Sequence, residues 1–267
     1  MRVCVTGHAG FIGRAVTRQL AGDGHHVVGY SLPRSDVLSE FDVNNAVDGC
    51  DAVIHLAGML GTHELFDTPH EAVEVNVLGT VNILEACRRH RCRYVGITMP
   101  AVFPSIYTAT KLCTQKLASA YHHSHGVPVS HVKAYNAYGP GQAYGPGHPQ
   151  KIVPTFARAG WLRNPMPIWG DGRQTVDLVH VDDLAALLVA ALVFGDDEVI
   201  EGGTGEPFTV AEVAEMVGDV TGSYGVQFLP MRRGERATHI VADADASPLG
   251  LPEFSHARFV DAIESYR

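Results

Sequence analysis

The chain has 267 residues, of which 46% are hydrophobic and 18% charged, and its formal net charge at pH 7 is −9. The size and the apolar fraction predict a globular protein of one or two lobes with a sizeable core. The acidic balance, without any basic run, argues against nucleic acid as a partner.

The first 140 residues alternate between predicted strands and predicted helices. Apolar, β-branched runs predict strands in "VCVTG", "HHVVGY", "DAVIHLAG", "RYVGIT" and "VPVSHVKAY". Helical patterns lie between them at residues 11–21, about 71–89 and about 107–124. Near-continuous apolar strands that alternate with helices are typical of an α/β protein with a doubly wound parallel sheet.

The composition changes after residue 139. The stretch "GPGQAYGPGHP" predicts a loop or a crossing between domains. The segment "DLVHVDDLAALLVAALVF" then returns to a strand followed by a helix. Its apolar run opens with an acid and is too short to span a bilayer. The tail from residue 199 reads as a smaller mixed region.

Cysteines, histidines and the N-terminus bear on the compartment. Five cysteines are scattered without a CxxC pair, which predicts free thiols in a reducing compartment. The histidine-rich stretches at 25–26 and 122–125 lie among polar residues, so we expect a solvated surface there and no metal site. The N-terminus shows no signal-peptide pattern, and we therefore expect a cytoplasmic protein.

Three glycines, Gly7, Gly10 and Gly13, follow the first predicted strand and open the first predicted helix. Glycine permits a tight turn and a close approach of the backbone to a pyrophosphate. The N-terminus of the helix adds N–H donors and a favourable dipole. The segment "VTGHAGFIGRAV" therefore predicts a dinucleotide site.

Seven segments resemble, in order, motifs of the extended short-chain dehydrogenases/reductases, the sugar-nucleotide epimerases and dehydratases. "TGHAGFIG" is similar to TGxxGFIG, "DAVIHLAG" to the fourth-strand motif beside the nicotinamide, "VNVLGTVNILEAC" to the Asn-bearing helix and "YTATK" to YxxxK. "KAYNAYGPG" resembles RxxNxYGP, "IWGDGRQTVDLVHVDDLA" resembles GDGxQxRDFxxVxD, and "EGGTGEPFTVAEVAE" resembles the start of the C-terminal lobe. The resemblance covers nearly the whole chain. It implies a dinucleotide-binding domain at residues 1–140 and 171–196 and a substrate-binding lobe at 141–170 and 197–267.

The resemblance implies a cofactor site in the first half of the chain. Asp42 and Val43 would hold the adenine, unless Asp42 is a surface acid. Asn76 would hydrogen-bond backbone near the active site, unless it is an ordinary buried cap. His55 is expected to be structural. The remaining residues implied to line the cofactor are Gly7, Gly10, Phe11, Ile12, Gly13, Leu56, Ala57 and Gly58.

The end of the second predicted strand departs from the usual NAD pattern. An NAD enzyme usually carries an acid there for the ribose 2′-OH, whereas this position falls on Tyr30 or Ser31. The missing acid and the nearby Arg34 would suit NADP. Epimerases that recycle their cofactor most often use NAD, so we predict NAD and keep NADP as the alternative.

Tyr107 and Lys111 are the predicted proton-transfer pair and would also touch the cofactor. At i and i+4 they share one face of a helix. A tyrosine with an ordinary pKa of about 10 is a poor base at pH 7. A close ammonium and the cationic nicotinamide favour the phenolate and bring this pKa toward the working range.

The hydroxyl residue that the family places after the fifth strand falls on Met99 in this sequence. Thr98 lies one residue early, where strand alternation would normally point it the other way. Pro100 could break that alternation, so our hypothesis is that Thr98 relays the proton. Ser105, or no hydroxyl at all, is the alternative.

The resemblance also implies residues for the substrate. Asn136 would bond the diphosphate. The family's first phosphate arginine falls on Val176 here, with Arg173 three residues earlier, and the pair Arg232-Arg233 precedes "GE" as the second one precedes "GD". We predict Arg173 and Arg233, because the guanidinium fork suits a diphosphate. Two polar loop residues, His63 and Glu64, are predicted to wall the sugar pocket.

These patterns predict an NAD-dependent epimerase that acts on a nucleotide-diphosphate sugar through a transient keto intermediate. An NADPH-dependent ketoreductase or a dehydratase is the alternative, although a dehydratase usually needs an Asp–Glu pair that Met99 and Pro100 do not provide. A non-catalytic nucleotide-sensing protein is the alternative of another class. In the family, helices such as those at 71–89 and 107–124 pair across a two-fold axis, so we expect a homodimer.

Overall fold

The computed structural model describes residues 1–145 and 147–267. A six-stranded parallel sheet in the order β2-β1-β3-β4-β5-β9 forms the larger lobe. Its strands are β1 (Arg2–Thr6), β2 (His26–Tyr30), β3 (Ala52–His55), β4 (Arg93–Thr98), β5 (Val129–Ala134) and β9 (Asp196–Gly202). The predicted doubly wound parallel sheet is confirmed. The strand order reverses beside β1, and in such sheets ligands bind outside the carboxyl ends of the strands at that point.

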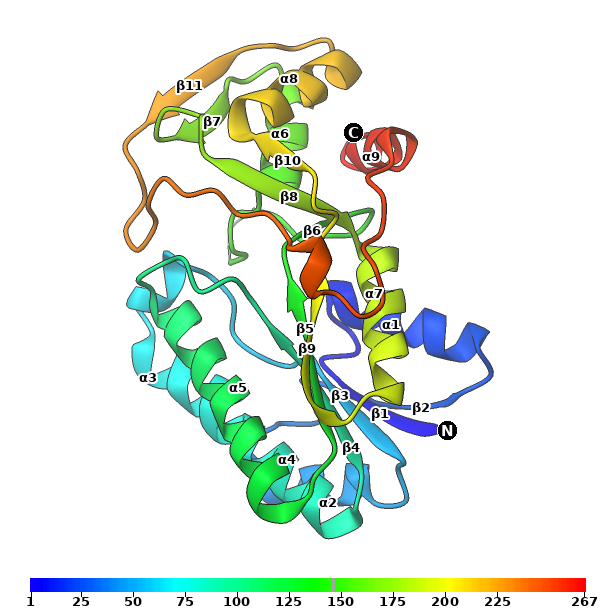
Figure 1. Ribbon diagram of the computed structural model, residues 1–267. Coiled ribbons are helices and arrows are strands. Elements are labelled where there is room, and N and C mark those ends of the chain that lie inside the picture. Colours follow the sequence, from blue (N-terminus) through cyan, green and yellow to red (C-terminus); the bar gives the residue numbers. More distant parts are fainter. Residues whose placement is uncertain (146) are drawn as a thin grey trace.

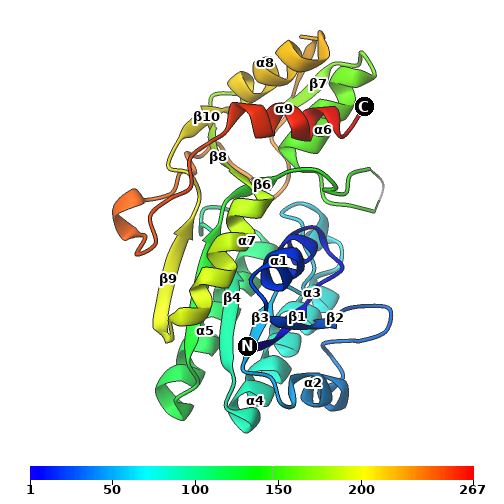
Figure 2. The same ribbon diagram turned by 90° about the vertical axis from the view of Figure 1, so that its right-hand side faces the viewer.

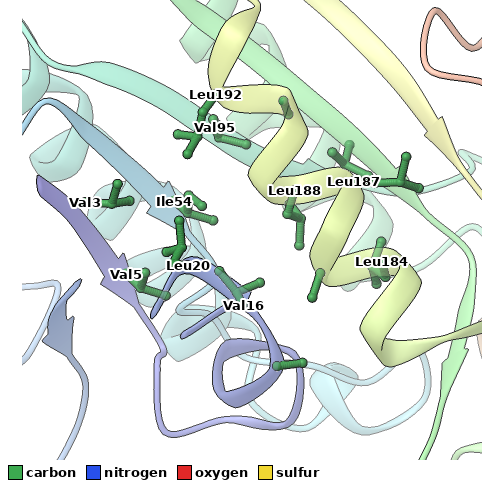
Figure 3. Packing of buried hydrophobic residues seen from close by; sticks show 14 of the residues in the cluster. Val3, Val5, Val16, Leu20, Ile54, Val95, Leu184, Leu187, Leu188 and Leu192 are labelled. Carbon is green, nitrogen blue, oxygen red and sulfur yellow. The ribbon is translucent and has the colours of Figure 1, made fainter. Parts of the chain in front are cut away.

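Helices cover both faces of this sheet (Figure 1). One face carries α2 (Glu40–Val47), α4 (Gly79–His90) and α5 (Ile106–His125), and the other carries α1 (Phe11–Gly22) and α7 (Val181–Ala190). Figure 3 shows leucines of α7 directed at the valines and isoleucines of the sheet. Among the described residues, no helix combines the length and the hydropathy that a membrane span needs.

The predicted helix at about 71–89 is continuous but irregular. It consists of α3 (Pro69–Val73), a π-turn η2 (Glu74–Leu78) and α4. Such π-turns are rare and often lie at functional sites. This one contains Asn76, which is buried.

The smaller lobe lies beyond the carboxyl ends of the large sheet (Figure 2). Its sheets are β10 (Pro207–Thr209), β8 (Thr175–His180) and β6 (Asn136–Tyr138), and the parallel pair β11 (Val226–Leu229) and β7 (Met166–Trp169). Three helices, α6 (Ile152–Trp161), α8 (Val210–Thr221) and α9 (His256–Glu264), share a core with them that includes Tyr138, Phe156 and Phe259.

Sheet membership differs from the predicted domain boundaries. Strand β9 pairs with β5 in the large sheet, although residues 197–202 were expected in the smaller lobe. Its acids, Asp196, Asp197, Glu198 and Glu201, hide the short apolar pattern of a strand. Strand β8 pairs instead with β6 and β10 in the smaller lobe, and the chain crosses back at the start of α7.

One buried carboxylate fixes the junction of the lobes. Asp177 on β8 accepts hydrogen bonds from Thr204 N–H at 2.7 Å, Thr204 Oγ1 at 2.8 Å, Gly205 N–H at 2.9 Å and Ala242 N–H at 3.0 Å. These bonds join β8 to the turn after β9 and to the C-terminal segment. They hold the two lobes in a fixed relation around the space between them.

Candidate active site

A cavity of about 380 Å³ lies at the carboxyl ends of the central strands. Its walls come from the glycine loop, the segment after β3, the segment after β4, helix α5 and the segment after β5. The cavity thus occupies the place where the strand order predicts a ligand. It brings together thirteen of the predicted site residues: Gly7, Gly10, Phe11, Ile12, Gly13, Leu56, Ala57, Gly58, Asn76, Thr98, Tyr107, Lys111 and Asn136.

The glycine loop leaves no room for larger residues. Gly7 has φ +68°, and a Cβ on it would lie 2.8 Å from Ala57 N. A Cβ on Gly13 would lie 2.1 Å from the carbonyl oxygen of Gly7. Gly10 is the N-cap of α1 and offers no side-chain cap, so the first N–H groups of the helix stay available to a ligand.

His55 has a structural role, as expected. Its Nδ1 lies 2.7 Å from Thr6 Oγ1 and its Nε2 lies 3.0 Å from Thr80 Oγ1. Thr6 Oγ1 in turn accepts the N–H groups of Leu56 and Ala57. Burial lowers the pKa of His55 to about 3, so the ring is neutral and holds the strand end in place.

Asn76 bonds backbone near the cavity. Its Oδ1 accepts Met59 N–H at 2.7 Å, and its Nδ2 donates to Met59 O and to Thr110 Oγ1, both at 3.1 Å. Asn76 Oδ1 would lie 2.9 Å from a Cβ on Gly58, which explains that glycine. The amide therefore joins the segment after β3 to the tyrosine-bearing helix.

Tyr107 and Lys111 both line the cavity from α5, one helical turn apart. Both residues are partly buried. Burial raises the pKa of Tyr107 to about 12 and lowers the pKa of Lys111 to about 8. At pH 7 the Tyr107 phenol is thus neutral and the Lys111 ammonium is still largely charged, although burial disfavours the charged form of both groups.

The segment after β4 is apolar on its cavity side. Met99 and Pro100 line the cavity together with Thr98. Thr98 is 2% exposed and its hydroxyl donates to Gln115 Oε1 on α5 at 3.0 Å. Its lone pairs, rather than its proton, are therefore free for a ligand. Ser105 is not among the cavity residues, because its hydroxyl caps α5 through Thr108 N–H at 3.2 Å.

Two residues predicted for the adenine lie elsewhere. Val43 is completely buried in the core beneath α2, so its side chain cannot contact a ligand and that prediction is wrong. Asp42 lies exposed in the first turn of α2. The acid in the loop that leaves β2 is Asp36, whose carbonyl oxygen accepts the Tyr30 hydroxyl at 2.6 Å. Asp36 lies between the end of β2 and Ser39, the N-cap of α2, and this position could have identified it in the sequence as the acid that follows β2.

Ser31 lies beside the glycine loop, and neither Ser31 nor Arg34 lines the cavity. Ser31 Oγ is 3.1 Å from His8 Nδ1. The His8 ring lies against Gly29, where a Cβ would come within 2.7 Å of it. Arg34 is exposed in the same loop. At the end of β2, where an NAD enzyme usually carries an acid, this protein thus has the hydroxyl of Ser31 and the imidazole of His8.

A smaller cavity of about 170 Å³ adjoins the first between the lobes. The residues that line both are Thr62, Phe103, Asn136, Lys151, Ile152 and Ile240. Lys151, which sequence reasoning missed, precedes α6 and shares the smaller cavity with Arg232 and the acids Glu64 and Glu235. Burial is the main cause that lowers its pKa.

The structure corrects the predicted arginines. Arg173 is exposed and does not line either cavity, whereas Val176 lines the smaller one. Arg233 points away, with its guanidinium 4.2 Å from the Phe66 ring and 3.6 Å from Asp67. Arg232 lines the cavity instead and lies 4.5 Å above the Trp169 ring.

The two predicted loop residues separate. Glu64 lines the smaller cavity, and its Oε1 accepts Gln150 N–H at 3.2 Å. His63 does not line either cavity. One further polar group, missed in the sequence, is Tyr135, which lines the larger cavity. Its hydroxyl donates to Glu201, the same buried carboxylate that pairs with Lys133.

Comparisons with known proteins agree with this geometry. Residues 3–203 match the sequence model of the NAD dependent epimerase/dehydratase family. A dTDP-glucose 4,6-dehydratase of Streptomyces niveus is 28% identical over 262 residues, which are 81% of this chain and 76% of that protein. A UDP-glucose 4-epimerase of Mycolicibacterium smegmatis is 29% identical over 277 residues, 88% of each chain. The solved complex of a Thermus thermophilus UDP-glucose 4-epimerase with NAD is 25% identical, covers 100% of this chain and 99% of its own, and has a TM-score of 0.89.

Proposed function

The chain belongs to the NAD dependent epimerase/dehydratase family, and we propose that it is an NAD-dependent epimerase of a nucleotide-diphosphate sugar that works through a transient keto intermediate. One observation carries the proposal: the glycine loop and the Tyr107–Lys111 pair open onto the same cavity. A binding protein needs the first feature but has no use for the second. The related epimerases, one of them solved with NAD, support the same conclusion.

The residues present fit a dinucleotide. A Cβ at Gly7 or Gly13 would fill the cradle that the backbone forms, and the first N–H groups of α1 would receive the pyrophosphate. Leu56, Ala57 and Gly58 would line the nicotinamide half. NAD, when bound, supplies the acceptor and the donor of hydride. Ser31 and Arg34 would stand near the adenosine ribose, with NADP as the alternative cofactor.

Tyr107 would remove the proton from the sugar hydroxyl that becomes the ketone, and would return it after the hydride comes back. Its phenolate needs help, because burial alone raises its pKa to about 12. Lys111 would provide that help as an ammonium one helical turn away, and would also hold the nicotinamide ribose.

Thr98 donates its own proton to Gln115, so it would accept a hydrogen bond from a sugar hydroxyl beside the reacting one, whose single proton goes to Tyr107. The hydroxyl would then position the sugar more than relay its proton. Met99 and Pro100 provide no acid to eliminate water, which favours an epimerase or a ketoreductase over a dehydratase.

The smaller cavity would hold the nucleotide half of the substrate. Asn136 and Lys151 line both cavities, so we assign them to the diphosphate that joins the two halves. Arg232 would be the second cation, because it lines the smaller cavity, whereas Arg233 packs on Phe66. On this view the six-stranded lobe binds the dinucleotide, and the lobe built on β6–β8–β10 and β7–β11 binds the substrate.

We also propose that the protein is a cytoplasmic homodimer. Val73 and Leu78, on the segment packed beside α4 and α5, are 49% and 50% exposed. Apolar side chains exposed on neighbouring helical segments suit an interface between two copies. Sedimentation equilibrium of the purified chain would report the mass; a monomer at micromolar concentration would rule the dimer out.

The decisive experiment for function is a panel of UDP-, dTDP- and GDP-hexoses incubated with the purified protein, with and without added NADPH. An epimerase converts one member to its epimer without added cofactor. Product formed only with stoichiometric NADPH would show the ketoreductase, which Ser31 and Arg34 would suit. Binding of a panel member without any product would show the nucleotide-sensing protein.

A further inference from the structure

Gln142 lines the larger cavity and is buried, with 8% of its surface exposed. Its Nε2 donates to the carbonyl oxygen of Ala137 at 3.0 Å. A carbonyl only accepts, so this partner fixes which end of the amide is nitrogen. Among residues 1–145 and 147–267, Oε1 then has no hydrogen-bond partner.

A buried acceptor without a partner destabilises the protein, because it loses its hydrogen bonds to water and gains none in return. The buried amide of Asn76, which lines the same cavity, does not leave such an atom, because both of its ends are bonded. The open acceptor of Gln142 therefore points to a ligand group that donates.

The segment that carries Gln142 is held rigidly beside the glycine loop. Arg14 donates to Ala9 O in that loop at 2.7 Å and to Gly141 O at 2.9 Å. The Tyr266 hydroxyl lies 3.3 Å from Gly139 O and 3.2 Å from Gln142 O. These bonds hold the backbone on both sides of Gln142, and the bond from Nε2 to Ala137 O orients the amide itself.

The chemistry of a dinucleotide narrows the donor. Pyrophosphate oxygens only accept, so they are excluded. The adenosine half would lie over β2, across β1 from this segment. Gln142, Asn136 and Ala137 all line the cavity and follow β5, the strand that neighbours β4 and packs against α5, the helix of Tyr107 and Lys111. The donors of the nicotinamide half are its ribose hydroxyls, which we assigned to Lys111, and its carboxamide NH₂.

We propose that Gln142 Oε1 accepts a hydrogen bond from the nicotinamide carboxamide and so positions the ring in the cavity. The inference rests on the proposed function, because it takes NAD as the cofactor. It assigns Gln142 as a positioning residue that decides which ring face meets the sugar. A ring held in this way also leaves the site more slowly.

The test compares NAD with 3-acetylpyridine adenine dinucleotide, in which a methyl ketone replaces the carboxamide and removes its N–H. Both are titrated calorimetrically into the full chain, freed of cofactor and without any sugar nucleotide. One neutral hydrogen bond is worth about tenfold in affinity. We expect the native chain to bind NAD about tenfold more tightly than the analogue. Gln142→Leu should weaken NAD about tenfold and the analogue less than about twofold.

Equal weakening of both dinucleotides would show a merely structural role and overturn the proposal. So would a native chain that binds the two equally, a comparison that needs no folded variant. Gln142→Asn keeps the amide but withdraws it by one methylene, and it should lose the same preference. If Gln142→Leu weakens only a nucleotide sugar, the donor is a sugar hydroxyl and the proposal falls while the proposed function stands. A native chain that binds neither dinucleotide would refute the proposed cofactor itself.

Discussion

Replacing Lys111 should change how the rate depends on pH as well as the rate itself. Burial raises the pKa of Tyr107 to about 12. Forming its phenolate at pH 7 then costs about 7 kcal/mol, at about 1.4 kcal/mol for each pH unit. The ammonium of Lys111 and the bound nicotinamide must offset most of this cost.

Lys111 itself is also perturbed, because burial lowers its pKa to about 8. Its charge is largely present at pH 7 and is lost as the pH rises through 8. We therefore expect kcat/KM of the native enzyme to fall above about pH 8. Lys111→Arg keeps a charge at every accessible pH, so its kcat/KM should be lower but should not fall above pH 8.

Lys111→Met removes the charge at every pH and should lower kcat/KM about 10²- to 10⁴-fold at pH 7. The assay is conversion of the active nucleotide sugar between pH 6 and 10. Lys116→Met, an exposed position on the same helix, is the matched control and should behave like the native protein. The reasoning is refuted if Lys111→Met costs less than tenfold, or if Lys111→Arg still loses activity near pH 8.

Three further changes test other parts of the account. Thr98→Val removes the hydroxyl bonded to Gln115 and should lower turnover about 10²-fold; an unchanged kcat would remove Thr98 from the reaction. Gly13→Ala places a Cβ 2.1 Å from the Gly7 carbonyl oxygen and should weaken NAD at least tenfold in a calorimetric titration, whereas Gly24→Ala, outside the loop, should leave affinity unchanged and bears only a local turn cost. The pKa of His55 is lowered from 6.5 to about 3, so its protonation in the unfolded chain lowers the free energy of unfolding as the pH falls below 6.5. The loss is about 2 kcal/mol between pH 7 and pH 5. In urea denaturation His55→Asn should lack that part of the acid sensitivity, and an identical pH dependence in both proteins would contradict the assignment.

The centre of the large sheet could be predicted from the sequence because β1, β3, β4 and β5 are largely buried and read as apolar runs. The glycine loop and the Tyr107–Lys111 pair were also predictable, since each depends on spacing within one short segment. The cavity now brings these segments together. Strand β9 was missed because its acids face outward or pair with residues that are distant in sequence, as Glu201 pairs with Lys133.

Predictions failed where a one-residue choice depends on tertiary contacts. Arg232 and Arg233 are adjacent, and the sequence does not distinguish them. In the structure Gly234 has φ +78° and lies against Phe66. The guanidinium of Arg233 packs on that ring, away from the smaller cavity. Val43 was assigned to the adenine because α2 was not predicted. In the structure it lies in this helix, which Ser39 caps, and faces the core. The role proposed for Gln142 could not be predicted from the sequence. It depends on the hydrogen bond from Nε2 to Ala137 O, which leaves Oε1 as the acceptor without a partner among the described residues.

The central claim is that one carbon of a nucleotide sugar is oxidised and then reduced by the same bound cofactor. The nucleotide-diphosphate hexose that the panel identifies as substrate tests it most directly, when it carries deuterium at the carbon that is inverted and is incubated with the purified chain and no added cofactor. We predict an epimer that keeps its deuterium at that carbon, with no net NADH. Inverted product that has lost the label to solvent would contradict the mechanism. If UDP-hexoses bind beside tightly held NAD and none is ever inverted, the enzyme assignment itself is wrong.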